Sequence, residues 1–389
     1  MAQVFYHSFP WRENNQFQLL VDGGEIFSAM LACVQRARSQ IFLEMYLVES
    51  GALLDRFISA LSEAVKRGVA VYLLFDGYGT RGLSLRDRER ITEAGMLLTI
   101  YNPVRFNLAR HNLFRDHRKL LVVDGRCAFV GGIGLADVFD VATHPKKFWH
   151  DIAVQVEGPV VADWSVLFRA NWQTWSGRYA PIVDKLAADP DRLALQDGQA
   201  GRLAGGHRFG ALSIHRSFLK RIRTAERHVW MMTAYFVPSR SLLRALRKAA
   251  RRGVDVRLLF PGPQTDHPSI RYAGHRYYAS LLRSGVRIFE YQPRFMHAKV
   301  LLCDDWASLG SSNIDRWNLR WNLEANQEIE DSNFANTVQE LFADGFMDSE
   351  ECLQAFWQLR SRYRRSLEWF WGKVEGALER FSIYLRRNK

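Results

Sequence analysis

Cysteine is scarce in this sequence, with four residues among 389. Cys33, Cys127, Cys303 and Cys352 stand far apart, and none belongs to a C-x-x-C pair. Structural zinc sites and the disulfide frameworks of secreted domains both depend on clustered cysteines. The spacing therefore argues against both kinds of site and favours a protein that works in a reducing, cytosolic environment.

Long apolar runs are missing as well. A membrane-spanning helix needs about 18 consecutive apolar residues, and no uncharged run in the chain approaches that length. The opening stretch, MAQVFYHSFPWRENNQ, has no apolar segment behind a basic cluster, which a secretory signal would show. We expect a chain that neither crosses a membrane nor carries such an export signal.

Acidic residues are outnumbered, since 41 Asp and Glu stand against 53 Lys and Arg, which gives a formal net charge of +12. Three classes of anionic partner fit this excess: nucleic acid, an anionic lipid surface and a phosphorylated substrate. Charge alone does not choose among them. The hydrophobic content of 48% supports a large core, and the length predicts two domains.

The chain contains an internal duplication. Residues 37–77, ARSQIFLEMYLVESGALLDRFISALSEAVKRGVAVYLLFDG, match residues 225–262, AERHVWMMTAYFVPSRSLLRALRKAARRGVDVRLLFPG. Both contain a β-rich run, a helical run, Arg-Gly-Val and a further apolar strand, in that order. Strands that alternate with helices predict an α/β sheet in each half. We therefore predict two duplicated α/β sandwich halves related by a pseudo-two-fold axis.

Composition suggests where the halves begin and end. Residues 187–206 are polar and rich in Gly, Ala and Asp, which is typical of a linker. We place the first half at 1–186, the linker at 187–206, the second half at 207–354 and a basic, aromatic tail at 355–389.

An octet recurs within the duplication, as HRKLLVVD at 117–124 and HAKVLLCD at 297–304. The apolar run in each is typical of a strand covered on both faces. Strand alternation then places His117 and Lys119 on one face, and His297 and Lys299 likewise. Asp124 with the glycine after it predicts a hairpin turn.

A turn of small residues follows each octet. The chain returns first as CAFVGGIG, which would bring Gly132 to Gly134 opposite His117. It returns next as WASLGSSN, which would bring Ser312 and Asn313 opposite His297. The backbone N–H groups of such turns, with a lysine nearby, form a pocket for an oxyanion such as phosphate.

Two histidines at one phosphate indicate that the two imidazoles have different roles in the reaction. If the pseudo-two-fold axis brings both octets to the seam between the halves, one neutral imidazole can attack while the other, protonated, serves the leaving oxygen. The two lysines would neutralise the charge on the phosphoryl oxygens in place of a metal. A nucleophilic histidine also needs a carboxylate on its far ring nitrogen. Asp151 and Glu324, which follow the octets at comparable distances, are the candidates.

The doubled H-x-K-x4-D motif, with the GG and GSSN that follow, resembles the phospholipase D superfamily. HRKLLVVDGRCAFVGGIGLAD, HDIAVQVEGPVV, AYFVPSRSLLRALRKAARRGV and GSSNIDRWNLRWNLEAN resemble bacterial cardiolipin synthases more narrowly, and the similarity runs from about Trp11 to about Ala343. The absence of leading transmembrane helices resembles the shorter B-type enzyme. The resemblance implies that one phosphatidylglycerol gives its phosphatidyl group to a histidine, releasing glycerol, and a second accepts it to form cardiolipin. It implies no metal and no organic cofactor.

The same resemblance implies roles for individual residues. The catalytic set of the motif is matched by His117, Lys119, Asp124, His297, Lys299 and Asp304. The expected substrate-binding residues of the two turns are Asn313, Ser311 and Gly132. Asp151 and Glu324 match the acids that orient the histidines. The place of the two motif aspartates at turns favours a structural role for them.

The sequence departs from the family pattern in two places. The family usually has asparagine where this chain has Gly134, so the first turn would depend on its backbone N–H groups. The second hairpin, from Asp304 to Gly310, is one residue shorter than the first, from Asp124 to Gly131.

The tail at 355–389 combines apolar, aromatic and basic residues. Steps of three and four along an amphipathic helix join Tyr363, Leu367, Phe370, Trp371, Val374, Leu378, Phe381 and Leu385. Arginines precede and follow this stripe, which predicts docking on an anionic membrane, with packing on the protein's own core as the alternative. We expect a peripheral protein on the cytoplasmic side of the cell membrane that acts on phosphatidylglycerol and has no nucleic-acid partner. The oligomeric state stays open.

Two other functions remain open at this point. A phosphodiesterase or nuclease could use the same doubled octet, and the positive charge would suit DNA. A non-enzymatic binding protein with vestigial sites is the second, although both octets are intact. Trp164, Trp172 and Trp175 recur at helical spacing, so we predict core positions for them rather than a base-stacking platform.

Overall fold

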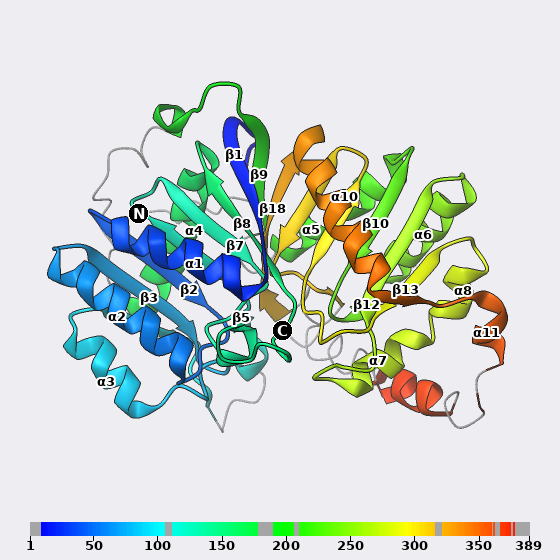
Figure 1. Ribbon diagram of the computed structural model, residues 1–389, viewed down its shortest axis with the longest axis horizontal. Helices are drawn as coiled ribbons and strands as arrows, with labels where there is room; N and C mark the ends of the chain where they lie inside the picture. Colours follow the sequence, from blue (N-terminus) through cyan, green and yellow to red (C-terminus); the bar gives the residue numbers. More distant parts are fainter. Residues whose placement is uncertain are drawn as a thin grey trace.

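A computed structural model gives the arrangement of the chain in space. It describes residues 9–105, 111–177, 190–205, 210–315, 321–359, 361, 366–374 and 376–377. Figure 1 shows two similar halves side by side, with helices packed against a sheet that continues from one half into the other.

The first half alternates strands and helices, as the sequence predicts. Its main elements are β1 (Arg12–Val21), α1 (Asp22–Arg36), β2 (Gln40–Met45), α2 (Ala52–Lys66), β3 (Ala70–Asp76), α3 (Leu85–Glu93), β4 (Leu97–Tyr101), β5 (Arg115–Asp116), β6 (Lys119–Val123), β7 (Cys127–Gly131), β8 (Ile152–Glu157) and α4 (Val160–Ser176). Trp164 and Trp172 on α4 are buried in the core, as predicted, and Trp175 is partly buried.

The second half repeats this order with additions. Its elements are β9 (Gln199–Gly205), α5 (Gly210–Thr224), β10 (His228–Met232), β11 (Phe236–Val237), α6 (Arg240–Arg251), β12 (Asp255–Pro261), α7 (Pro268–His275), α8 (Tyr278–Leu282), β13 (Arg287–Tyr291), β14 (Val300–Cys303), β15 (Trp306–Gly310), β16 (Ile314–Asp315), β17 (Asn322–Leu323), β18 (Ala325–Glu330), α10 (Ser332–Met347), β19 (Ser349–Glu351) and α11 (Gln354–Gln358).

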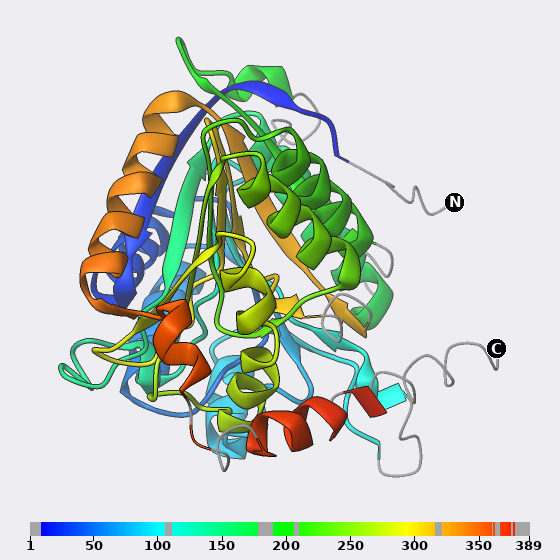
Figure 2. The same cartoon turned by 90° about the vertical axis from the view of Figure 1, so that its right-hand side faces the viewer.

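One sheet of 15 strands runs through both halves, in the order β19-β13-β12-β10-β14-β15-β18-β9-β1-β8-β7-β6-β2-β3-β4. At its middle, β1 and β9 pair antiparallel. Reading outward from that pair gives equivalent strands on the two sides, with β19 added at one edge. This symmetric order confirms the predicted α/β fold of two duplicated halves. In Figure 2, α10 (orange) lies on one side of the strands and the green helices of the second half lie on the other.

The hydrophobic core joins the two halves. One cluster of buried side chains includes Val154 and Trp164 from the first half together with Phe334 and Val338 from the second. Two further clusters lie within single halves, one under α1 and α2 and the other under α5 and α6. Burial of large apolar side chains across the seam stabilises the pairing of the halves.

Two boundaries differ from the predicted ones. The stretch 187–206, predicted as a linker, contains β9, which pairs with both β1 and β18. Its small residues suit a strand packed closely between neighbours: a Cβ at Gly201 would lie 2.4 Å from the Phe17 ring. In the tail, α11 and a separate helix at 366–374 replace the first part of the single helix expected, and residues 378–389 lie outside the described residues. Among the described residues, no helix has the length and apolar content needed to cross a membrane.

Candidate active site

The two octets meet at the seam between the halves. β5, just before the first octet, pairs in parallel with β17 of the second half. The His117 amide donates a hydrogen bond to the Leu323 carbonyl at 3.0 Å, and the His297 amide donates to the His150 carbonyl at 2.7 Å. Each histidine is therefore attached by its backbone to the residue that precedes the acid of the other half.

Each imidazole contacts a carboxylate across the seam. His297 Nδ1 lies 2.7 Å from Asp151 Oδ2. His117 Nδ1 lies 3.0 Å from Glu324 Oε1 and 3.2 Å from Oε2. The acid that follows each octet in the sequence thus serves the histidine of the other octet. Because Nδ1 faces the carboxylate, Nε2 on the far side of each ring is the nitrogen available to a substrate.

Burial and nearby lysines keep both histidines neutral. Burial, followed by Lys119 and Lys299, holds the pKa of His117 well below the usual 6.5. Burial and Lys299 lower the pKa of His297 to about 4, although Asp151 acts in the opposite direction. Both rings are therefore uncharged at neutral pH in the empty site, and an anionic phosphate between them would raise their pKa values.

The two acids differ in their electrostatics. Burial raises the pKa of Glu324 to about 8, against the opposing charge of Lys119. Burial also disfavours the charged form of Asp151, but Lys299 and His297 outweigh it and lower the pKa of this carboxyl. Asp151 is ionised at neutral pH, whereas Glu324 keeps its proton over much of that range. The two histidines, although related by symmetry, therefore have different partners.

Both lysines of the octets are buried in the site. Lys119 Nζ donates to the His117 carbonyl at 2.6 Å, and Lys299 Nζ lies 3.0 Å from His297 Nδ1. Burial lowers the pKa of Lys119 to about 7. The Asp151 carboxylate already lies near these amino groups, and a bound phosphate would add further negative charge beside them.

The turn residues divide into two groups. Gly132 lies against Asp151, where an added Cβ would be 2.5 Å from Oδ1, and the Ser311 hydroxyl donates to Glu324. These two residues therefore contact the acids. Asn313 is 1% exposed, and neither polar atom of its side chain has a partner in the described part of the chain. A buried amide without a hydrogen-bond partner costs about 1–3 kcal/mol of stability, so a hydrogen bond from Asn313 to a polar ligand would be favourable.

Gly134, where the resemblance led us to expect asparagine, is packed too tightly for a side chain. A Cβ there would lie 2.9 Å from the Leu47 Cβ and 3.0 Å from the Leu47 carbonyl oxygen. The first turn consequently lacks an amide equivalent to that of Asn313. This is a second asymmetry between the two halves of the site.

The motif aspartates lie at the far ends of their strands, away from the histidines. Asp124 has a φ of 54° and accepts hydrogen bonds from the backbone N–H groups of residues 38, 39 and 40 at 2.8–3.0 Å. Asp304, with a φ of 51°, accepts from residues 226, 227 and 228 at 2.9–3.0 Å. Their inclusion in the catalytic set is corrected: they anchor the hairpin turns to the starts of β2 and β10.

The sequence analysis missed Tyr46. Its ring lies edge-on to His117 at 4.7 Å between centroids, and Lys119 Nζ lies 5.0 Å from its centre. In the second half, Tyr235 lies 6.4 Å from His297 and donates a hydrogen bond to Asp266. The sequence signal that indicates these residues is a tyrosine shortly after the first strand of each repeat.

A buried charged network supports only the first octet. Arg118, which is 2% exposed, contacts Glu44 at 2.6 Å and Asp116 at 3.0 Å, and the Asn171 amide donates to both acids. In the second half the corresponding positions are apolar, with Ala298 in place of the arginine. Sequence analysis did not identify this network, because its members are scattered along the chain. Within the described residues, no group of three or more His, Cys, Asp or Glu is arranged to hold a metal ion.

Comparison with known proteins identifies the family. The family described as "Cardiolipin synthase, PLD-like domain" matches residues 30–137 and 218–345, and each segment contains one octet. The chain belongs to this family. Within it, cardiolipin synthase B of Salmonella typhi is 36% identical over 343 residues, which cover 85% of this chain and 80% of that protein. Cardiolipin synthase A of Pseudomonas aeruginosa is 33% identical over 344 residues, covering 88% and 69%.

Solved structures of other proteins share this fold. Phosphatidylserine synthase of Haemophilus influenzae Rd KW20 has a TM-score of 0.70 over 95% of this chain and 94% of its own, at 14% identity. Polyphosphate kinase of Porphyromonas gingivalis has a TM-score of 0.59 over 93% and 53%, at 12% identity. At these identities the likeness shows the fold alone. The predicted family and fold class are confirmed.

Proposed function

We propose that this chain is a phosphatidyltransferase that makes cardiolipin from two molecules of phosphatidylglycerol, releasing glycerol. Relatives that are named cardiolipin synthases match this chain over most of its length. The observation that carries the proposal is the pair of buried, neutral histidines at one seam, each held through Nδ1 by an acid of the opposite half. Such a pair suits transfer through a covalent phosphohistidine.

The first half-reaction forms that intermediate. His117 Nε2 attacks the phosphorus of the first phosphatidylglycerol, so that a P–N bond forms as the P–O bond to glycerol breaks. His297, protonated once the phosphodiester is bound, gives its proton to the departing glycerol oxygen. The negative phosphodiester raises the pKa of His297 from its low value in the empty site and so makes this protonation possible.

The second half-reaction reverses the roles. Neutral His297 takes the proton from a hydroxyl group of the second phosphatidylglycerol, whose oxygen attacks the phosphorus. A P–O bond forms, the P–N bond breaks, and His117 leaves as a neutral imidazole. Cardiolipin is the product, and the proton on His297 is ready for the next glycerol.

The remaining residues hold the phosphoryl group and the histidines. Lys119 and Lys299 would balance the charge on the phosphoryl oxygens, and the Asn313 amide would donate to one of them. The Asp151 carboxylate would accept a hydrogen bond from His297 Nδ1–H, and the unprotonated oxygen of the Glu324 carboxyl would accept one from His117 Nδ1–H, so that Nε2 of each ring is free to act at phosphorus. These assignments agree with the burial of all five side chains.

We also propose that the enzyme works at the cytoplasmic surface of an anionic membrane. A diacyl lipid with a charged headgroup presents its phosphodiester at that surface. The net charge of +12 favours association with anionic lipid, within about 10 Å at moderate salt.

The test is product analysis on labelled substrates. Purified protein with vesicles of labelled phosphatidylglycerol should yield cardiolipin and glycerol, with activity that survives chelation, and should leave DNA intact. His117→Ala and His297→Ala should each abolish turnover. A labelled, acid-labile adduct should form at His117 in the parent. Phosphatidic acid as the product would contradict this proposal and favour a phosphodiesterase. Cleavage of DNA would contradict it and favour a nuclease.

A further inference from the structure

The helix at 366–374 turns its aromatic side away from the protein. Trp369 is 66% exposed and Phe370 51% exposed, whereas Glu368 is only 5% exposed and Gly372 is buried. A helix packed on a hydrophobic core buries its apolar face instead. Core packing, the alternative considered for the tail, therefore leaves the exposure of Trp369 and Phe370 unexplained.

Polar contacts hold the helix in this orientation. Glu368 lies 3.7 Å from His275 Nδ1 at the end of α7, and Arg276 donates a hydrogen bond to the Gly372 carbonyl. His275 also contacts Glu290 at 3.0 Å, which connects the helix to β13. The inward side of the helix is thus held by the contact of Glu368 with His275 and by a close backbone approach at Gly372.

α11 lies against the same histidine and adds to the outward face. The Trp357 ring packs 5.2 Å from His275 and 4.7 Å from Tyr278, so it points inward. Its neighbours Phe356 and Leu359 are 69% and 79% exposed. Figures 1 and 2 show α11 and the helix at 366–374, in orange-red and red, at the end of the molecule where α7 lies.

The amino-acid sequence of this segment is basic. Residues 354–377 contain five Lys and Arg and two Glu, and one of those acids, Glu368, is turned inward. Lys373 is exposed, with its Nζ 5.6 Å from the Trp369 ring. Aromatic side chains beside basic ones suit the headgroup region of an anionic bilayer, where rings lie at the interface and cations meet lipid phosphates.

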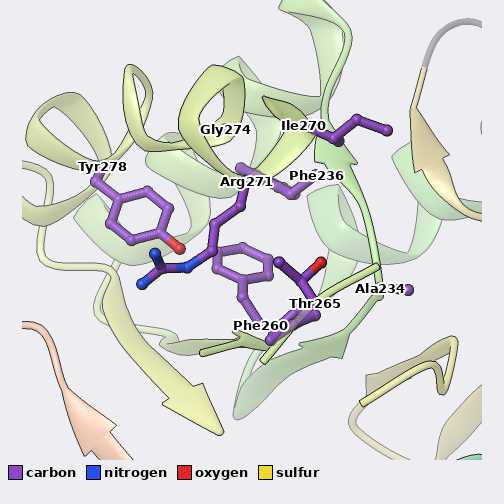
Figure 3. Close-up of a pocket in the computed structure, with 9 residues that line it drawn as sticks. Ala234, Phe236, Phe260, Thr265, Ile270, Arg271, Gly274 and Tyr278 are labelled. Atoms are coloured by element: carbon purple, nitrogen blue, oxygen red, sulfur yellow. The ribbon is translucent and has the colours of Figure 1, made fainter. Parts of the chain in front are cut away.

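α7 connects this outward face to the active site. Figure 3 shows Ile270, Arg271 and Gly274 of α7 along one side of a hollow, with Phe236 beside them and with Phe260 and Thr265 across from them. The residue before Phe236 is Tyr235, whose ring contacts His297. α7 therefore contacts both the helix at 366–374 and the segment that leads to the second histidine.

We propose that Phe356, Leu359, Trp369 and Phe370 form a docking surface that binds an anionic membrane. The proposal rests on the proposed function, which requires a membrane lipid as substrate. It differs from the stripe predicted from the sequence: Leu367, Trp371 and Val374 of that stripe are partly buried, and Trp369 lies outside it. The docking surface, on two elements, replaces that stripe.

Vesicle binding and catalysis should be measured separately on full-length variants. Trp369→Asp combined with Phe370→Asp should weaken sedimentation with vesicles of phosphatidylglycerol and phosphatidylcholine by about ten-fold or more. Phe356→Asp, on a different element, should weaken it in the same direction. Met347→Asp is the matched control, because that side chain is 78% exposed in the same half but outside the docking surface. It should bind like the parent.

Activity on dispersed short-chain phosphatidylglycerol separates this proposal from the proposed function. Folded docking-surface variants should keep that activity while losing activity on vesicles. If the parent makes no cardiolipin from either substrate, the proposed function fails whatever the binding result. The docking proposal is overturned if the folded variants, Phe356→Asp included, bind anionic vesicles like the parent, or if the parent binds pure phosphatidylcholine equally well. A variant that changes only self-association in ultracentrifugation would assign the surface to a second copy instead.

Discussion

Lys119 is a residue of the site whose charge changes near neutral pH. It is 4% exposed, and burial lowers its pKa to about 7. Its ammonium group lies between the His117 carbonyl and the Tyr46 ring, two weak partners compared with a carboxylate. The proposed phosphate-binding charge is therefore lost as the pH rises through about 7 in the free enzyme.

Lys119→Arg should remove this alkaline loss. A guanidinium stays protonated when buried, so the variant's kcat/KM should stay level from about pH 7 to 9, at a lower absolute value, while that of the parent falls. Initial rates across that pH range provide the measurement, and exposed Lys66→Arg serves as the control. If kcat/KM declines equally in parent and variant, Lys119 is not the group that titrates.

The exchange of acids across the seam is testable at single residues. Asp151→Asn should shift the titration of His297 and leave that of His117 in place, because the 2.7 Å contact links Asp151 to His297. Glu324→Gln should do the opposite. Histidine-selective NMR gives the assignment, and each variant should lose about 10²- to 10⁴-fold in turnover. Effects on the histidine of the same half would contradict the crossed arrangement.

Among the elements, β6 and β14 show how far the duplication extends. Both strands are buried along their whole length and contain the apolar parts of the two octets. The residue between histidine and lysine differs, however, because Arg118 enters a buried charged network and Ala298 enters the hydrophobic core. The two symmetry-related strands are therefore stabilised by different interactions.

Arg118→Met should destabilise the fold by about 3–5 kcal/mol at pH 7, because it leaves Glu44 and Asp116 buried without their cation. The loss should shrink as the pH falls toward 5. In the parent, burial already holds the pKa of Glu44 well above its usual value, whereas at Asp116 burial is outweighed by Arg118, which lowers the pKa of that carboxyl. Without Arg118 the pKa of Asp116 should rise above its unfolded value, so the variant's stability is present at low pH and lost as the pH rises. Urea unfolding at several pH values measures this, with exposed Arg126→Met as the control. A pH-independent loss would argue against the charge explanation.

The packing of the whole molecule predicts that it unfolds as one cooperative unit. The sheet is continuous across the seam, and one core cluster draws side chains from both halves. Trp164 of the first half is fully buried, and its Nε1 donates to Gln327 Oε1 of the second half at 2.8 Å. Separate unfolding of the halves would expose this shared core.

Trp164→Ala should lower the stability of both halves together, by about 3–5 kcal/mol, through lost burial and a cavity. Calorimetry should show a single transition in the parent and a single, lower transition in the variant. Trp369→Ala, at an exposed position, should leave the transition temperature unchanged. Two separated transitions in the variant would show that the halves unfold independently.

The sequence by itself determined the repeat, the α/β class and the two octets, since these depend on local order and periodicity. Identical spacing of His117 with Lys119 and of His297 with Lys299 was enough to predict one shared phosphate site. Asp151 and Glu324 could be chosen as acids because each follows an octet. Their allocation could not be predicted, because both acids stand at comparable distances from the two octets.

The tertiary structure decided which parts of distant segments meet. It placed β9, a polar stretch without a strong strand pattern, at the middle of the sheet, because pairing with β1 and β18 satisfies its backbone. It crossed the acids over to the opposite histidines, built the network around Arg118 and turned Trp369 outward. Contacts between residues that lie hundreds of positions apart in the sequence depend on the packing of the whole chain, so short-range sequence patterns do not predict them.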